Sequence, residues 1–231
     1  MGKVSVIVPV HNEAKNLERN IKELERQLNL SLGDFEIIIS EDGSTDRTAE
    51  ISRLHRSDKI RVLNSSERLG KGAAIKLASA KARGNIIIFM DADLASQPAS
   101  VKDLVKHIEG GAAIVVGSRY LKDSKAKRSV TRLIASKAFN WLVILLFNSK
   151  INDHQCGFKA FQKELVLPTM DEIENIGWFW DAELLIRTQR KGLKVVEIPI
   201  EWTEAQGSKF QIINDSMQMA YCLARFKLKN G

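Results

Sequence analysis

Two aspartates one residue apart, Asp91 and Asp93, follow directly after the apolar run NIIIFM at residues 85–90. The run predicts a buried strand. Two carboxylates this close repel each other unless a cation or water lies between them. A hard divalent cation, Mg²⁺ or Mn²⁺, prefers such oxygen ligands and would also bind the phosphates of a nucleotide. The competing interpretation is that both aspartates cap the following loop, but their place directly after a strand favours a metal site.

The elements that must position these aspartates alternate along the first half of the chain. Short apolar strands are expected at residues 3–10, 35–40, 60–64, 85–90 and 112–117. Helical periodicity predicts helices between them, at 12–28 with Asn12 as N-cap, at 46–56 and at 71–82. This order predicts an α/β fold with a mostly parallel central sheet and helices on both faces. After residue 118 the pattern loosens, and the clearest elements are two apolar helical stretches at 139–147 and 210–226.

Polar segments follow each of the first four strands, at the edge where such sheets bind ligands. They are PVHNE (9–13), SEDGSTD (40–46), SSERLGKG (65–72) and DADLASQP (91–98). Their carboxylates suggest a cation or hydroxyl groups as ligands. Gly70 and Gly72 fit a turn as well as a ligand contact, and the spacing is not that of a P-loop. Ser44 and Asp46 are more simply explained as a cap of the second helix.

Composition limits the class of protein. The chain has 231 residues, 44% of them apolar, which fits one globular domain. Its two cysteines, Cys156 and Cys222, have no metal-binding spacing, which favours a reducing, cytoplasmic compartment. The N-terminus does not resemble a signal peptide. The net charge of +7 is compatible with a nucleic-acid-binding protein. No RNA-binding motif or basic helix with interleaved aromatics supports that class, so we expect no nucleic-acid partner.

The net positive charge of the chain arises from two segments. Residues 119–137 contain seven Lys and Arg against one Asp, and residues 209–231 contain four against one. Each adjoins an apolar stretch, FNWLVILLF (139–147) or residues 210–226. A nine-residue run is too short to span a membrane, which takes about 20 residues. We therefore expect peripheral binding to anionic lipid, with Lys125, Lys127 and Arg128 among the contacting charges. The alternative is a solvated basic loop beside ordinary core helices.

Several motifs in a fixed order resemble a known family. VSVIVPVHNEAKNL, EIIISEDGSTDRT, RLGKGAAI and IIIFMDADL resemble the inverting glycosyltransferases of family 2, which have the Rossmann-like GT-A fold. GSRY, DHQCGFKAF, WFWDAELL and WTEAQGSK resemble the dolichyl-phosphate hexose synthases, a group that includes mannose synthases and β-glucosyltransferases. The resemblance covers nearly the whole chain. It implies one GT-A domain over residues 1–231, with nucleotide-sugar binding in 1–118 and acceptor binding in 119–231.

The resemblance also implies roles for individual residues. The residues implied for the nucleotide sugar are Pro9, His11, Glu13, Asp42, Lys71, Asp91, Ala92 and Asp93. Those implied for the acceptor phosphate are Arg119, Arg132, Ser136 and Lys209. Asp91 and Asp93 would hold the metal, and the catalytic set would be Asp93, Arg119 and Asp181. A carboxylate such as Asp181 is also favoured at a helix start for electrostatic reasons alone.

The implied reaction is metal-dependent, inverting transfer of a hexose from a nucleotide sugar to dolichyl or polyprenyl phosphate. Ala95 and Thr203 stand where mannose synthases usually have Gln and Arg, so UDP-glucose is favoured over GDP-mannose as donor. Ala95 also leaves the third metal ligand open. A family 2 enzyme with a soluble saccharide acceptor is the runner-up, and a non-catalytic sugar-nucleotide-binding relative is disfavoured by the intact Asp91 and Asp93. The implied location is the cytoplasmic face of a membrane, and a membrane-embedded partner is left open.

Overall fold

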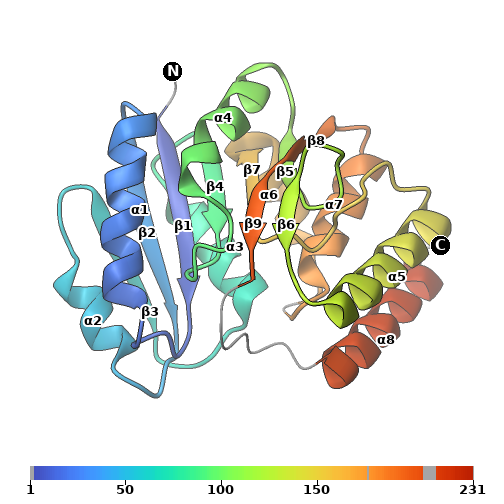
Figure 1. Cartoon of the computed structure of the whole chain (residues 1–231), viewed down its shortest axis with the longest axis horizontal. Coiled ribbons are helices and arrows are strands. Elements are labelled where there is room, and N and C mark those ends of the chain that lie inside the picture. The colour runs from blue at the N-terminus through green and yellow to red at the C-terminus, as the bar shows by residue number, and fades with distance from the viewer. Residues whose placement is uncertain (1–2, 176, 205–211, 231) are drawn as a thin grey trace.

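A seven-stranded sheet runs through the centre of the protein, as the computed structural model shows in Figure 1. The structure describes residues 3–175, 177–204 and 212–230. The strand order is β3-β2-β1-β4-β7-β5-β8, and every neighbouring pair is parallel except the two that β7 forms. The bounds are β1 Val4–Val10, β2 Phe35–Asp42, β3 Ile60–Ser65, β4 Ile86–Met90, β5 Ile114–Ser118, β7 Phe158–Gln162 and β8 Val195–Pro199. The predicted mostly parallel α/β sheet is confirmed.

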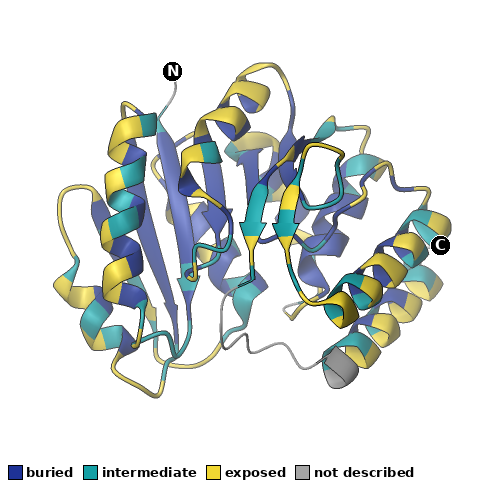
Figure 2. Cartoon of the chain, viewed as in Figure 1, coloured by how far each residue is buried: buried dark blue, intermediate teal, exposed yellow. Residues whose placement is uncertain are grey.

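Helices cover both faces of this sheet. On one face α1 contacts α2 and α4, and on the other α6 lies between α3 and α7 (Figure 1). The bounds are α1 Leu17–Ser31, α2 Thr48–Leu54, α3 Lys71–Lys81, α4 Val101–Glu109, α6 Lys163–Asp171 and α7 Trp180–Arg190, with a 3₁₀ turn at Pro98–Ser100. Strands β2, β4 and β5 are buried along their whole length and β1 at every residue except Pro9 (Figure 2), as expected for strands covered on both faces.

The first helix begins later than the sequence pattern predicts. Asn12 was expected to cap a helix at 12–28, but α1 begins at Leu17. Asn12 instead has a left-handed backbone with φ of 54°, and its side-chain oxygen accepts a hydrogen bond from the backbone N–H of Thr45 at 2.8 Å. Asn tolerates this conformation better than most residues, and its amide links the loops after β1 and β2.

Strand β7 lies between β4 and β5 and is antiparallel to both, which the sequence pattern did not predict. The pairing of Met90 with Phe158 places the start of β7 beside the end of β4. As a result, the residues just before β7 reach the same sheet edge as Asp91. Strands from both halves of the chain therefore form one sheet and one ligand-binding edge.

The remaining elements lie beside the sheet. Strands β6 (Lys125–Lys127) and β9 (Glu201–Thr203) form a small parallel sheet, and helices α5 (Val130–Phe147) and α8 (Ile212–Asn230) pack side by side (Figure 1). A second apolar core joins α5, α7 and α8, where Phe179 contacts the rings of Phe139 and Phe226. These elements attach the basic segment after residue 118 to the main sheet.

Candidate active site

Asp91 follows β4 at the carboxyl edge of the sheet and is paired with a lysine. The Nζ of Lys71, at the first position of α3, donates to Asp91 Oδ1 at 2.6 Å. Burial alone would lower the pKa of Lys71. The neighbouring carboxylates, Asp91 first and Asp181 and Asp93 after it, outweigh burial and raise this pKa above its usual value. Three carboxylates therefore lie close enough to one ammonium group to stabilise its charge.

Asp93 is in a strongly negative environment. Loss of surrounding water and the Asp91 carboxylate raise its pKa, and Glu13 adds to the effect, although part of the Asp93 side chain still reaches solvent. One Asp93 oxygen accepts the backbone N–H of Ala95 at 3.0 Å. This contact is the local cap that the competing interpretation predicts. The cap uses one of the two carboxylate oxygens of Asp93. The repulsion between the Asp91 and Asp93 carboxylates, which a cation would relieve, is still present.

Gly157, just before β7, lies directly against Asp91. A Cβ atom at Gly157 would be 1.9 Å from Asp91 Oδ2, so any other residue would displace that carboxylate. The motif DHQCGFKAF thus contributes a backbone wall to the site. The spacing along the sequence could not show this contact, because it arises from the antiparallel pairing of β7 with β4.

The donor set fits a divalent cation that is shared with phosphate oxygens. Mg²⁺ is usually held by one or two carboxylates together with substrate phosphates, rather than by a full protein cage. Asp91 and Asp93 supply two such carboxylates, and Ala95 supplies no third side-chain ligand. Within residues 3–175, 177–204 and 212–230, no group of three or more His, Cys, Asp or Glu is placed to hold a metal. Asp91 and Asp93 would hold the cation, which would neutralise the leaving diphosphate when bound.

The segments after β1 and β3 meet at Asp42, the last residue of β2. Its two carboxylate oxygens accept the backbone N–H groups of Leu69 at 2.6 Å and Gly70 at 3.0 Å, and its carbonyl lies 2.8 Å from His11 Nδ1. Asp42 therefore fixes the turn before α3. Gly70 has φ of 93°, which a glycine adopts readily, so the turn interpretation is confirmed for this residue.

The other residues of this edge lie where the sequence places them. Pro9 is in β1, and Glu13 follows it, with its backbone N–H bonded to Thr48 Oγ1 at 2.8 Å. Asp46 Oδ1 accepts the N–H of Thr48 at the start of α2 at 2.9 Å, as expected. Ser44 does not cap this helix, because its Oγ accepts the N–H of Asn12 at 3.0 Å. The carbonyl of Ala92 accepts a hydrogen bond from the buried Asn20 side chain at 2.8 Å. This contact attaches the segment between the two aspartates to α1.

Asp181, in the first turn of α7, forms a buried ion pair. Lys159 of β7 is completely buried, and its Nζ donates to Asp181 Oδ1 at 2.5 Å and to the carbonyl of Cys156 at 2.5 Å. Lys159 was not singled out from the sequence, because a lysine in an apolar strand gives no indication of its partner. The ion pair holds the Asp181 carboxylate in place, close enough to Lys71 to raise the pKa of that lysine.

Arg119, directly after β5, is held by a second buried ion pair. Its Nε and Nη2 donate to the two oxygens of Asp153 at 2.7 and 2.8 Å. Burial opposes both charges, but the pairing outweighs it, so the pKa of Asp153 is lowered and that of Arg119 is raised. The Arg119 side chain is only 9% exposed. The predicted acceptor residue is therefore fixed rigidly, with much of its hydrogen-bonding capacity used inside the protein.

The rest of the predicted acceptor set surrounds Ser136 of α5. Arg132 Nη1 pairs with Glu204 Oε1 at 2.5 Å. Ser136 Oγ accepts hydrogen bonds from the Tyr120 hydroxyl at 2.6 Å and from Arg128 Nη2 at 2.8 Å. Arg128 was expected on the lipid-facing surface but turns into this cluster. Lys209 lies outside the described residues.

The sequence profile of "Glycosyl transferase family 2" matches residues 5–167. The chain belongs to this family. It is 38% identical to glycosyltransferase AglD of Haloferax volcanii over 96% of this chain and 36% of that protein. It is 33% identical to dolichyl-phosphate beta-glucosyltransferase of Homo sapiens, over 98% of this chain and 75% of that protein. The chain thus spans about a third of the archaeal relative and three quarters of the human one.

Solved structures support the fold of this family 2 chain. Glucosyl-3-phosphoglycerate synthase of Mycobacterium tuberculosis, crystallised with Mn²⁺, uridine diphosphate and phosphoglyceric acid, gives a TM-score of 0.74 at 22% identity. The match covers 98% of this chain and 78% of that one. The predicted GT-A architecture is confirmed by this similarity.

Proposed function

We propose that this family 2 chain transfers glucose from UDP-glucose to a polyprenyl phosphate such as dolichyl phosphate. The main support is the similarity to dolichyl-phosphate beta-glucosyltransferases, which extends over 98% of the chain for the human protein and over 94% for that of Saccharomyces cerevisiae. It includes the acceptor half, residues 119–231, where family 2 enzymes with other acceptors would differ. The UDP bound in the mycobacterial neighbours favours a uridine donor, although those proteins share only the fold.

The geometry suits a single displacement between two anionic substrates. Asp91 and Asp93 follow β4 and Asp91 pairs with Lys71 at the start of α3, and a second charged cluster, of arginines, follows β5. A phosphate monoester is largely ionised near neutral pH, since its second pKa is about 6. Its oxygen therefore attacks the anomeric carbon without a strong general base, and one displacement inverts that centre. The protein mainly aligns the substrates and offsets their repulsion.

The donor and acceptor assignments are tested by one transfer assay. Radiolabelled UDP-glucose, GDP-mannose and UDP-GlcNAc are each offered with dolichyl phosphate and Mg²⁺ or Mn²⁺. We expect label to enter the organic phase fastest from UDP-glucose. Faster labelling from GDP-mannose would keep the enzyme class but reject the sugar. No lipid labelling, with transfer to a soluble saccharide instead, would favour the alternative acceptor class.

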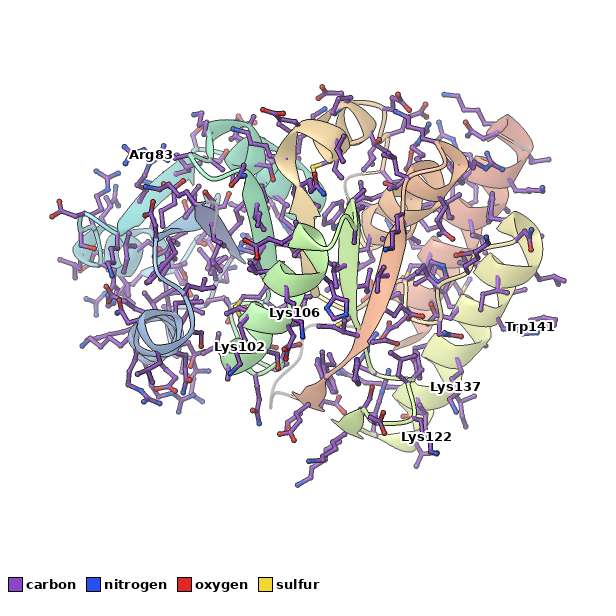
Figure 3. The ribbon with its side chains drawn as sticks, turned by 90° about the horizontal axis from the view of Figure 1, so that it is seen from above. Arg83, Lys102, Lys106, Lys122, Lys137 and Trp141 are labelled. Carbon is purple, nitrogen blue, oxygen red and sulfur yellow. The ribbon has the colours of Figure 1, made fainter. Side chains whose placement is uncertain are left out.

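We also propose that α5 and α8 rest on the cytoplasmic face of an anionic membrane. Ile134, Lys137, Trp141 and Leu145 occupy one exposed stripe of α5, and Figure 3 shows Lys137 and Trp141 pointing outward from this helix. On α8, Met217, Tyr221 and Leu228 are also exposed. Apolar and cationic side chains on one helix face are typical of interfacial binding.

Helix α5 is longer than the apolar run that indicated it. Over 18 residues it meets the length and composition expected of a membrane-crossing helix, the one such helix in residues 3–175, 177–204 and 212–230. The expectation that this segment is too short to span a membrane was based on the nine-residue run alone, and the full length of α5 does not support it. The buried Phe139 and Val143 attach one side of α5 to the second core, which favours binding along the surface.

A liposome assay tests the membrane surface. The protein is expected to sediment with vesicles that contain phosphatidylserine and to be released as salt rises, because surface charges are screened. Lys137→Glu with Trp141→Ser should reduce binding at least tenfold, since about 1 kcal/mol per basic residue and the burial of an aromatic side chain are lost. Leu54→Ser, at an exposed site on α2, is the matched control and should bind normally. The proposal would be contradicted if sedimentation with vesicles did not depend on lipid charge and was unchanged in the Lys137→Glu, Trp141→Ser variant.

A further inference from the structure

Two arginines after β5 share the same pair of aromatic rings. The guanidinium carbon of Arg119 lies 5.4 Å from the Trp202 ring centroid and 5.9 Å from that of Tyr120. The corresponding distances for Arg128 are 5.7 and 5.8 Å. Like charges held this close repel each other, so each charge requires an opposite charge or solvent nearby. The partners of each arginine therefore show where an anion is still required.

Arg119 already has its counter-charge within the protein. Asp153 accepts two hydrogen bonds from it and is itself fully buried. Arg132, one turn further along, pairs with Glu204 at 2.5 Å. These ion pairs neutralise both charges and hold both side chains in place.

Arg128 has no carboxylate partner among the described residues. Its nitrogens donate to neutral oxygens only, namely the Tyr120 hydroxyl at 3.1 Å, Ser136 Oγ at 2.8 Å and the carbonyl of Arg132 at 3.0 Å. Its Nε is buried and forms no hydrogen bond within the described part of the chain. A buried donor without an acceptor costs stability. The cluster thus contains an oriented guanidinium group whose charge is not neutralised by any carboxylate in the described part of the chain.

We propose that Arg128 is a binding residue for the phosphate of the acceptor, with Arg119 and Arg132 supporting it from their ion pairs. This inference rests on the proposed function, since it names a contact for the same acceptor. A phosphomonoester carries about −1.5 to −2 charges near pH 7 and presents three acceptor oxygens. A planar guanidinium group binds such an oxyanion with paired hydrogen bonds, which a flexible lysine does not match. Tyr120 and Ser136 hold the group in one orientation.

The test uses geranyl phosphate, a short soluble prenyl phosphate, so that membrane binding does not contribute. Its affinity is measured by calorimetry and by ³¹P NMR, and UDP-glucose affinity is measured in parallel. Arg128→Gln is expected to weaken geranyl phosphate binding at least tenfold and to leave UDP-glucose affinity within twofold. Lys127→Gln removes the same charge from the neighbouring, exposed position and should change neither affinity by more than twofold.

Arg128→Lys covers the case in which Arg128→Gln does not fold, as judged by thermal unfolding. It keeps the charge but loses the planar donors, so geranyl phosphate should bind several-fold more weakly. Wild-type affinity in either folded variant, or equal losses for geranyl phosphate and UDP-glucose, would overturn the assignment of Arg128. The proposed function is tested separately from this site. If the wild-type protein binds geranyl phosphate through Arg128 but glucosylates no prenyl phosphate, the assignment of Arg128 is kept and the proposed reaction is rejected.

Discussion

Replacing either Asp91 or Asp93 with asparagine is expected to lower the rate of sugar transfer about a thousandfold or more. A bound cation contributes several kcal/mol of charge stabilisation in the transition state, and about 4 kcal/mol corresponds to three orders of magnitude in rate. Each carboxylate is one of the two that directly follow β4 and are expected to hold the cation. The transfer assay with saturating donor and acceptor measures the loss.

The fold should not change in these variants, because neither side chain belongs to the core. Asp91 is 40% exposed and its partner Lys71 is 24% exposed, so loss of this ion pair should have little effect on thermal unfolding. Mn²⁺ binding, followed by electron paramagnetic resonance with UDP present, should weaken in parallel with the rate. Asp34→Asn, at an exposed position directly before β2 and at the other end of this strand from the site, serves as the control. Full activity of the wild-type enzyme in excess EDTA would reject the metal assignment.

The first half of the fold could be predicted from the sequence because its elements are local. Each of the five strands expected up to residue 118 is present, with ends shifted by a few residues at most. These strands are mostly apolar, and the polar residues after them mark the expected ligand-binding edge. The late start of α1 was missed because Asn12 fits a cap by type, whereas its actual contact is with Thr45, across the edge of the sheet.

The second half could not be predicted in the same way, because its contacts join segments far apart in the chain. Strand β7 is only five residues long, and nothing local shows that it inserts between β4 and β5. The contact of Gly157 with Asp91 depends entirely on that insertion. A residue type indicates what a side chain can bind, but its partner depends on the tertiary fold.

The candidate site shows the same division. The sequence correctly placed Asp91, Asp93 and Lys71 at one edge, since they follow or begin predicted elements. The resemblance implied an acceptor role for Arg119, and the basic segment suggested a lipid contact for Arg128, but neither indicated the partners of these two arginines. Only the structure shows that Asp153 neutralises Arg119 and that Arg128 turns away from the expected lipid surface.

The buried pair of Lys159 and Asp181 is expected to have the largest effect on stability. Lys159→Met leaves the Asp181 carboxylate without its partner, and Asp181→Leu leaves a completely buried ammonium group. Breaking a buried ion pair from one side typically costs about 3–5 kcal/mol. Each single variant should therefore lose roughly this much free energy of unfolding, measured by urea denaturation.

The double variant Lys159→Met with Asp181→Leu is expected to be more stable than either single variant, because no isolated charge is left in the core and apolar replacements of similar volume often offset the lost pair. Lys125→Met breaks the exposed pair with Glu201 and should change stability little, which controls for loss of a surface lysine. Additive losses in the double variant would mean that the two side chains act independently, against the 2.5 Å contact between them. A folded double variant also isolates the chemistry of Asp181: if it binds UDP-glucose normally and transfers nothing, the carboxylate acts directly on the reaction and does more than anchor α7.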